Sequence, residues 1–436
     1  MSIFSKHLPA IHVGHHKNTA DSPTEKMPLP DKVYISMVQH IGAPCQPKVA
    51  VGDHVKVGQV IGDSDAFVSA PIHSSASGTV KAIENTMTLV GIWDPIVTIE
   101  LDKKQEVFEG ISPPEVSDKA SFLKAVRDSG LVGLGGAAFP THVKFNPKNL
   151  DEVDTLIING AECEPYITAD YRTMLEDSDL IVGGVKNTMK YLNIKRGIIA
   201  IESNKAPAIN KLRELVKDTP EIEVMELKPV YPQGAERVLI YEATGRPLPL
   251  GKLPADVGVI VSNVSSIVAL QKYILTGMPL ISKRLTVDGT AVTTPKNLEV
   301  LIGTQVKELI EFCGGYKLPA RKILMGGPMM GRAIYDDSTP IIKNNNAILA
   351  FDEDWAKAAK ETACINCGRC IKACPLSLMP KNIHDAFDNN NIDELKKLSV
   401  ALCMECGSCT YVCPAKRQLS FINKLAKQKV MEGGKK

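Results

Sequence analysis

The sequence has few long apolar runs and little excess of charge of one sign. No stretch is apolar for the roughly eighteen residues that a membrane span needs, so we expect no transmembrane segment in this chain. Residues 1–20 lack the apolar core and cleavage site of a signal peptide. The net charge is only +2, which argues against a nucleic-acid surface and against strong attraction to anionic lipid.

Cysteine is scarce outside one C-terminal stretch. Of the eleven cysteines, only Cys45, Cys163 and Cys313 stand apart from it, and we interpret Cys163 as a small buried thiol. A large chain with this cysteine usage does not indicate a disulfide framework, and it favours a reducing compartment. Aromatic residues make up 5% of the 436 residues, within an ordinary globular composition. At about 150 residues per domain, this length predicts several domains.

The other eight cysteines form two copies of the spacing C-x2-C-x2-C-x3-C-P. This spacing is typical of ferredoxins with two [4Fe–4S] clusters, in which three close cysteines bind one cube and the fourth binds the other. A zinc site has no use for the repeated third cysteine and proline. The rule assigns Cys364, Cys367, Cys370 and Cys413 to the first cluster, and Cys403, Cys406, Cys409 and Cys374 to the second.

The N-terminal part of the chain is expected to contain an arm and a small β module. Residues 1–30 are polar and rich in proline, which predicts an extended arm. Residues 31–110 contain short strands around glycine turns in two similar halves, as in lipoyl-like barrel-sandwich modules. The turn between the halves, residues 63–67, has no lysine, so we expect a docking module without a covalent cofactor arm.

The pattern changes beyond residue 110. In residues 111–279, apolar strands near 153–158, 197–201 and 257–261 alternate with helical stretches, which predicts a Rossmann-like domain with a mainly parallel sheet. Residues 280–340 are again rich in strands and suit a small β-grasp domain. Residues 341–436 contain the cysteines and are expected to form a ferredoxin-like domain. The predicted fold class is therefore multidomain α/β.

Three segments of the central domain have the composition of a nucleotide site. A glycine-rich loop at 133–136 allows close approach of backbone N–H groups to a ligand, although a turn between packed elements explains it equally well. Asn159, Glu162 and Glu164 follow one expected strand, and residues 262–266 follow another. Ligands of parallel α/β sheets bind at these carboxyl ends, and helix N-termini there suit phosphate.

The order of these segments is similar to that in the FMN- and NADH-binding subunit of respiratory complex I. The resemblance rests on the segments Gly133–Lys144, Asn159–Pro165, Gln233–Glu236 and Asn263–Ser266. It implies that FMN is bound by Gly133, Gly135, Gly136, Lys144, Asn159, Gly234, Asn263 and Ser266. It implies an NADH side lined by Phe139, Glu164 and Glu236. Two acidic residues of the family pattern are replaced here, by Ala161 and Ala235.

The whole arrangement, from the barrel-sandwich module through flavin and β-grasp-like (SLBB-like) domains to a two-cluster ferredoxin, resembles the C subunits of Rnf membrane complexes. The A subunit of the Na⁺-pumping NADH:quinone reductase lacks the ferredoxin cysteines, and cobalamin reductases lack the N-terminal module. The resemblance implies a peripheral subunit on the cytoplasmic side of the cell membrane. Its expected partners are integral membrane subunits, which translocate ions, and a ferredoxin-like iron–sulfur subunit.

The expected activity is a ferredoxin:NAD⁺ oxidoreductase that uses FMN, NAD(H) and two [4Fe–4S] clusters. Hydride exchange with NADH involves two electrons and the clusters carry one at a time, so a flavin is needed between them. No side chain is expected to act as a catalytic acid or base. Two alternatives remain from the sequence: a soluble NADH-dependent reductase of the cobalamin type, and a passive electron-transfer scaffold whose flavin site has decayed.

Overall fold

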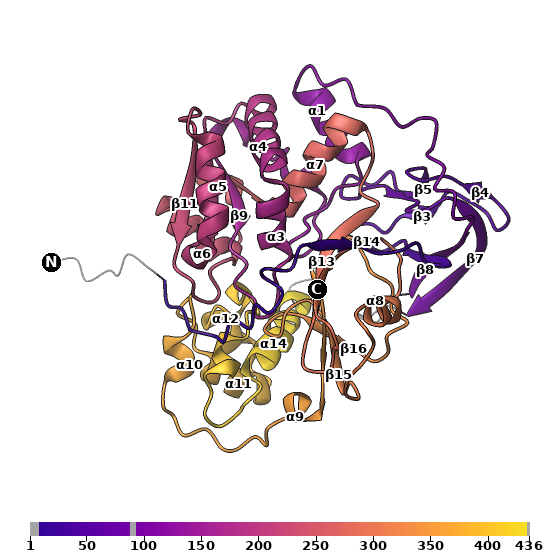
Figure 1. Cartoon of the computed structure of the whole chain (residues 1–436). Coiled ribbons are helices and arrows are strands. Elements are labelled where there is room, and N and C mark those ends of the chain that lie inside the picture. The colour runs from indigo at the N-terminus through magenta and orange to yellow at the C-terminus, as the bar shows by residue number, and fades with distance from the viewer. Residues whose placement is uncertain (1–7, 88–92, 434–436) are drawn as a thin grey trace.

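The computed structural model describes residues 8–87 and 93–433, which form four sheets and a C-terminal group of helices (Figure 1). Two of the sheets belong to the N-terminal module. One has the order β2-β8-β7-β4 and the other β3-β5-β6. Their strands are Lys32–Ser36 (β2), Gln46–Pro47 (β3), His54–Val55 (β4), Val60–Asp63 (β5), Ile72–His73 (β6), Gly78–Met87 (β7) and Trp93–Leu101 (β8).

The sequence alternates along the central strands of this module. In β2, Val33 and Ile35 are fully buried, and in β8 the same is true of Val97 and Ile99. Because successive side chains of a strand point to opposite faces, this spacing buries one face of each strand in a common core. The result is the barrel-sandwich that the sequence predicts.

His73, at the end of β6, is a buried titratable group that this module must keep neutral. Burial, and then the charge of Lys343, lower its pKa from 6.5 to about 3. Its Nδ1 has no hydrogen-bond partner among the described residues. Gly130 packs closely against the ring, since a Cβ there would lie 2.9 Å from Nδ1.

This burial predicts a loss of stability in mild acid. Between pH 6.5 and 3 the unfolded chain binds a proton at this histidine and the folded chain does not. Protonation therefore favours the unfolded chain, so the protein has its full stability above pH 6.5 and loses stability as the pH falls below that value. The expected loss is about 1.4 kcal/mol of unfolding free energy per pH unit. His73→Gln should show a shallower decline than the wild type in denaturant titrations from pH 7 to 4. Identical slopes for the two proteins would contradict this prediction.

The second unit is a parallel sheet with the order β11-β10-β9-β12. Its strands are Thr155–Gly160 (β9), Arg196–Glu202 (β10), Ile222–Leu227 (β11) and Val259–Asn263 (β12). Neighbouring residues of one strand enter different cores: Ile158 packs with the helices of one face and Ile157 with those of the other. Burial on both faces explains why these strands are almost continuously apolar.

Apart from the short helix at 141–144, which was not predicted, the helices of this unit alternate with its strands as the sequence predicts. They are Lys119–Asp128 (α1), Thr141–Lys144 (α2), Ala169–Glu176 (α3), Ser178–Leu192 (α4), Ala206–Val216 (α5), Glu236–Thr244 (α6) and Val264–Thr276 (α7). Strand β11 is an addition to the three strands expected from the sequence. It is an edge strand, and its alternation of buried and exposed residues differs from the apolar runs of the central strands β9 and β10.

The third unit is a six-stranded sheet with the order β1-β14-β13-β17-β15-β16. Its strands are Thr24–Lys26 (β1), Ser282–Asp288 (β13), Lys296–Leu301 (β14), Lys322–Met325 (β15), Arg332–Ile334 (β16) and Ala347–Phe351 (β17), with helix Val306–Phe312 (α8). Strand β1 comes from the N-terminal arm and pairs in parallel with β14. Strand β17 follows residue 340, where we expected the β-grasp-like domain to end, and all five of its residues are buried.

The fourth unit is helical and contains the eight cysteines. Its helices are Arg369–Lys372 (α10), Pro380–Asp388 (α11), Ile392–Lys397 (α12), Ser408–Tyr411 (α13) and Leu419–Gly433 (α14), and a short helix, Glu353–Ala356 (α9), precedes them. Gly368 and Gly407 come directly before α10 and α13, with φ of 70° and 80°. These left-handed conformations favour glycine, so each C-x2-C-G turn begins a helix in the same way. In the described part of the chain, no helix is long and apolar enough to cross a membrane.

Candidate functional site: two cysteine cavities beside a strand-end cradle

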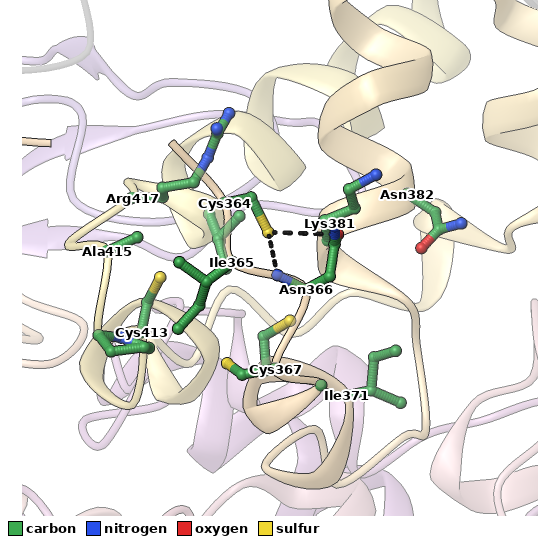
Figure 2. A pocket seen from close by; sticks show the side chains of 14 residues that line it. Cys364, Ile365, Asn366, Cys367, Ile371, Lys381, Asn382, Cys413, Ala415 and Arg417 are labelled. Atoms are coloured by element: carbon green, nitrogen blue, oxygen red, sulfur yellow. Dashed lines mark hydrogen bonds between the residues drawn. The ribbon is translucent and has the colours of Figure 1, made fainter. Parts of the chain in front are cut away.

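The eight cysteines divide between two cavities. The first, of about 120 Å³, is lined by Cys364, Cys367, Cys370 and Cys413. Figure 2 shows Cys364, Cys367 and Cys413 around it, with Arg417 and Lys381 at its edge. The second, of about 20 Å³, is lined by Cys374, Cys403, Cys406 and Cys409. Each cavity therefore has three cysteines of one run and the fourth cysteine of the other.

The surroundings of the sulfur atoms suit an anionic metal–sulfur group. Backbone N–H groups point at thiol sulfurs in both cavities: Asn366 N lies 3.4 Å from Cys364 Sγ, and Leu378 N lies 3.3 Å from Cys374 Sγ. Such hydrogen bonds stabilise cluster sulfur. At the first cavity, the buried Nε of Arg417 has no hydrogen-bond partner among the described residues. A guanidinium N–H left unpaired in the lining of this cavity is a donor that an anionic group could satisfy.

The donor set does not suit a single metal ion. Among residues 8–87 and 93–433, no three histidine, cysteine or carboxylate side chains lie close enough to bind one ion. A [4Fe–4S] cube has its four ligands at separate corners, and these lie farther apart than the ligands of one ion. The cysteine cavities therefore fit a cube better than they fit zinc.

A second candidate site lies at the carboxyl ends of β9 and β12. Asn159 and Asn263 are the register partners at these ends, so their side chains emerge at one edge of the sheet. Asn159 Nδ2 donates to the Gly234 carbonyl over 2.9 Å. Asn263 caps α7, and its Oδ1 accepts from Ser265 N over 2.8 Å. The two strand ends, the N-terminus of α7 and the loop before α6 thus form one structure, which we call the strand-end cradle.

The glycine loop lies over this cradle. A Cβ on Gly135 would lie 2.6 Å from Asn263 Nδ2, so the loop backbone passes directly above the asparagine. Leu134 N donates to Ser266 Oγ over 3.0 Å and anchors the loop to the first turn of α7. A Cβ on Gly136, by contrast, would meet no atom within 4 Å, and Gly133 has only ordinary contacts with Phe139. The loop therefore leaves open space beside Gly136.

Lys144 and Glu236 meet at the edge of the cradle. Lys144 Nζ lies 3.4 Å from Glu236 Oε1 and donates to the Val261 carbonyl over 3.2 Å. Both side chains are partly exposed, so the pair is open to solvent and to a ligand. The structure thus brings together the eight residues expected to bind FMN, together with Phe139 and Glu236 from the expected NADH side.

The two carboxylates after β9 have different surroundings. Glu162 is buried, and its carboxylate accepts from Asp170 N over 2.7 Å at the N-terminus of α3. Glu164 points to the third unit, where its Oε2 accepts from Met329 N over 3.0 Å. Burial raises the pKa of each carboxyl to about 7. The structure therefore places Glu164 against the Met329 loop and does not bring its carboxylate into contact with Lys144 or Glu236.

The N-terminal arm reaches this acidic loop, which the sequence did not reveal. Lys17 Nζ donates to the carbonyl oxygens of Glu162, Glu164 and Ile167 over 2.8, 2.9 and 2.5 Å. Desolvation lowers the pKa of this ammonium group, and the neighbouring Glu162 carboxylate opposes that shift. The lysine therefore fixes the backbone of the loop that follows the strand-end cradle. No motif signals such a contact, because it depends on a fold that brings together segments 145 residues apart.

Removal of this ammonium group should loosen the loop. Lys17→Met leaves three carbonyls without their donor, and hydrogen bonds to charged groups contribute roughly 1.5–3 kcal/mol each. We expect a loss of about 2–3 kcal/mol of unfolding free energy, measured by denaturant titration. This is less than the sum for three such bonds, because the variant also avoids the cost of burying the ammonium group. Lys26→Met is the matched control, because Lys26 lies in the same arm with an exposed side chain. Equal stability of the two variants would contradict the role of Lys17.

Tyr231 joins the cradle side of the molecule to the second cysteine cavity. Its hydroxyl donates to the Cys406 carbonyl over 2.7 Å, and its ring is 1% exposed. The same loop carries Gly234, whose N–H lies 3.4 Å from Cys163 Sγ. Tyr231, Cys163, Cys406 and Met329 belong to one apolar cluster. A continuous packed path therefore connects the strand-end cradle to a ligand of the second cavity.

Comparison with known protein families divides the chain in the same order. Residues 8–104 match the RnfC barrel sandwich hybrid domain, and residues 126–272 match the Nuo51 FMN-binding domain. Residues 284–333 match the SLBB domain, and residues 363–417 match the 4Fe–4S dicluster domain. The predicted sequence of domain types is confirmed.

Similar proteins cover most of the chain. The C subunit of a proton-translocating ferredoxin:NAD(+) oxidoreductase complex from Clostridium ljungdahlii is 48% identical over 84% of this chain and 80% of its own length. The C subunit of a Na(+)-translocating ferredoxin:NAD(+) oxidoreductase complex from Acetobacterium woodii is 40% identical over 97% of this chain and 96% of its own. The C subunit of an ion-translocating oxidoreductase complex from Pseudomonas aeruginosa is 38% identical over 83% of this chain and 47% of its own.

Solved structures resemble the fold at much lower identity. A chain in the crystal structure of the NAD⁺-reducing [NiFe]-hydrogenase in the H₂-reduced state aligns with 71% of this chain and 60% of its own length, with a TM-score of 0.50. The identity is 18%, so this likeness concerns the fold alone.

Proposed function

We propose that this chain, which belongs to the family of Rnf complex C subunits, connects NAD(H) with a one-electron carrier. Its activity would be that of a ferredoxin:NAD⁺ oxidoreductase subunit. The observation that supports this best is the hydrogen bond from Tyr231 to the Cys406 carbonyl, because it joins the strand-end cradle and the cysteine cavities in one packed body. Neither part alone would link two-electron and one-electron chemistry.

The strand-end cradle has the features that FMN requires. Asn159, Gly234, Asn263 and Ser266 would hold the cofactor at the carboxyl ends of β9 and β12, where the N-terminus of α7 suits its phosphate. The open space beside Gly136 would admit a ring close to the backbone. The Asp170 carboxylate limits where the phosphate could lie, because it already accepts hydrogen bonds from Asn263 Nδ2 and from Ser265 Oγ over 2.7 and 2.6 Å. The phosphate would therefore lie on the Ser266 side of the helix end.

The chain's own residues would act by binding and orienting. FMN, when bound, exchanges hydride with a nicotinamide and single electrons with iron–sulfur clusters. Lys144 would place positive charge beside the cofactor, since its ammonium is held at the end of β12 by the Val261 carbonyl. Phe139 and Glu236 would line the NADH side. Glu164 would act there only if its carboxylate left Met329, so we assign it the weaker part in nucleotide binding.

The cysteine cavities would hold the two clusters in series. The second cavity is the one in contact with Tyr231 and Cys163, so its cluster would exchange electrons with FMN. The first cavity would communicate with the outside, because its ligand Cys367 is exposed whereas Cys403 and Cys409 of the second are buried. Partner subunits in the membrane would translocate ions, and this chain would bind to them on the cytoplasmic side.

A reconstitution experiment tests the proposed function. The protein is loaded anaerobically with iron, sulfide and FMN, freed of unbound cofactor and mixed with NADH. Bound flavin whose absorbance is bleached by NADH, followed by reduction of the clusters, would support the proposal. FMN that washes off, with no reduction by NADH, would instead identify a passive scaffold. Recovery of the native protein only in soluble cell fractions would favour a soluble reductase over a membrane-complex subunit.

A further inference from the structure

The mouth of the first cysteine cavity carries exposed apolar side chains. Ile365 is 68% exposed and Ile371 is 36% exposed, and both line the cavity (Figure 2). Burial of such side chains is favourable, and at the entrance to a functional cavity they are typical of a surface that contacts another protein.

Three cations are close to these isoleucines or to other cavity-lining residues along the chain. Arg369 and Lys372 lie on α10, whose Cys370 and Ile371 line the cavity. Lys416 lies between Ala415 and Arg417, which also line it. All three cations are exposed, and none forms an ion pair with another described residue. We call the exposed residues Ile365, Arg369, Ile371, Lys372 and Lys416 the rim, which combines apolar and positively charged side chains.

The charged side chains of α10 are open to solvent. Arg369 and Lys372 are three residues apart on this short helix and both are exposed. Ala373, directly after the helix, is buried with Ile11, Val13 and Tyr231 and attaches its end to the body of the molecule. The two carboxylates closest in the chain to the cavity lining are already engaged: Asp385 with Lys381, and Glu361 with the N–H of Gln418.

We propose that this rim is the docking surface for an acidic electron-carrier protein. The proposal rests on the proposed function, because only a chain with redox clusters needs such a partner. An acidic surface would complement the unpaired cations, and opposite charges both accelerate encounter and orient the two proteins. Ile365 and Ile371 would then be covered at the centre of the contact, where interfaces are most apolar. The partner would approach the more exposed of the two cavities.

A binding measurement without NADH tests this surface. The oxidised protein with both clusters is titrated calorimetrically with a small acidic ferredoxin at low and at physiological ionic strength. We expect Arg369→Glu/Lys372→Glu to weaken binding at least tenfold at low salt, and to reduce the dependence on salt because fewer screened charge pairs remain. Lys186→Glu/Lys190→Glu on α4 changes the net charge equally at exposed positions far along the chain, and should bind as the wild type does.

The iron content of each variant shows whether weaker ferredoxin binding comes from the changed surface or from loss of a cluster. If the charge-reversed variant retains less iron than the wild type, Arg369→Gln/Lys372→Gln replaces it, with a smaller expected effect in the same direction. Unchanged ferredoxin binding, or equal weakening in the α4 control, would overturn the proposal. So would a variant that loses binding only to anionic phospholipid vesicles, because the rim would then face lipid. Since no NADH is present, failure of the proposed activity leaves this result unaffected.

Discussion

Replacement of Cys374 with alanine should remove the cluster of the other cysteine run. Cys374 belongs to the first run in sequence, yet it lines the second cavity with Cys403, Cys406 and Cys409. Without its fourth thiolate this cavity should lose its cube, while the first cavity retains four cysteines. About half of the iron and acid-labile sulfide should therefore be lost. Transfer of electrons from NADH beyond the flavin should fall by more than tenfold, because the second cavity is the one packed beside the cradle.

Electron paramagnetic resonance distinguishes which cluster remains. Cys413→Ala is the reciprocal variant and should remove the cluster of the first cavity instead, so the two variants should retain different signals. Cys313→Ala is the matched control, because Cys313 is buried in the core of the third unit and lines neither cavity. Loss of the first-cavity signal in Cys374→Ala would show that the crossed arrangement is not the one that binds metal.

Gly135→Val should abolish FMN binding while both clusters remain. A Cβ at this position would lie 2.6 Å from Asn263 Nδ2 and 2.8 Å from its Cγ, so valine would displace the asparagine or lift the loop. Either change disrupts the strand-end cradle. We expect at least a hundredfold loss of FMN affinity, measured by fluorescence titration of the apoprotein, with iron content as in the wild type. Stoichiometric FMN in this variant would contradict the assignment of the loop.

A substitution at a second glycine tests whether FMN is excluded by steric conflict alone, without damage to the cradle. A Cβ on Gly136 would meet no protein atom within 4 Å, and this glycine is absent from the residues with positive φ. Gly136→Val should therefore leave the thermal stability of the apoprotein unchanged. If the open space belongs to FMN, this variant should still bind the cofactor at least tenfold more weakly. Normal FMN affinity would place the cofactor elsewhere on the loop.

The fold was accessible to sequence analysis where periodicity and motif spacing carry the information. Regular alternation identified the barrel-sandwich module, and apolar runs between helices identified the parallel sheet. Strand β11 was missed because an edge strand with exposed glutamates has no apolar run. Strand β1 was missed because three residues, Thr24–Lys26, are too few for a pattern, and only the partner strand β14 makes them a strand.

The sequence likewise predicted only part of the candidate site. Motif order predicted which glycines and asparagines meet at the strand ends, because parallel strands place their carboxyl ends at one edge. The contacts of Lys17 and Tyr231 were not predicted, since each joins segments more than 100 residues apart through backbone carbonyls, which any residue has. Glu162 shows the converse: a carboxylate in a nucleotide-like motif serves here to bind the N–H groups of α3.

The position of the N-terminal arm has a consequence for the order in which the molecule assembles during synthesis. Asn18 binds Asp288, 270 residues later, and β1 needs β14 as its partner. A ribosome releases the arm early, yet Asp288 and β14 are made more than 250 residues later, so these two contacts form only after most of the chain has been synthesised. The segment that is translated first thus makes some of the last tertiary contacts.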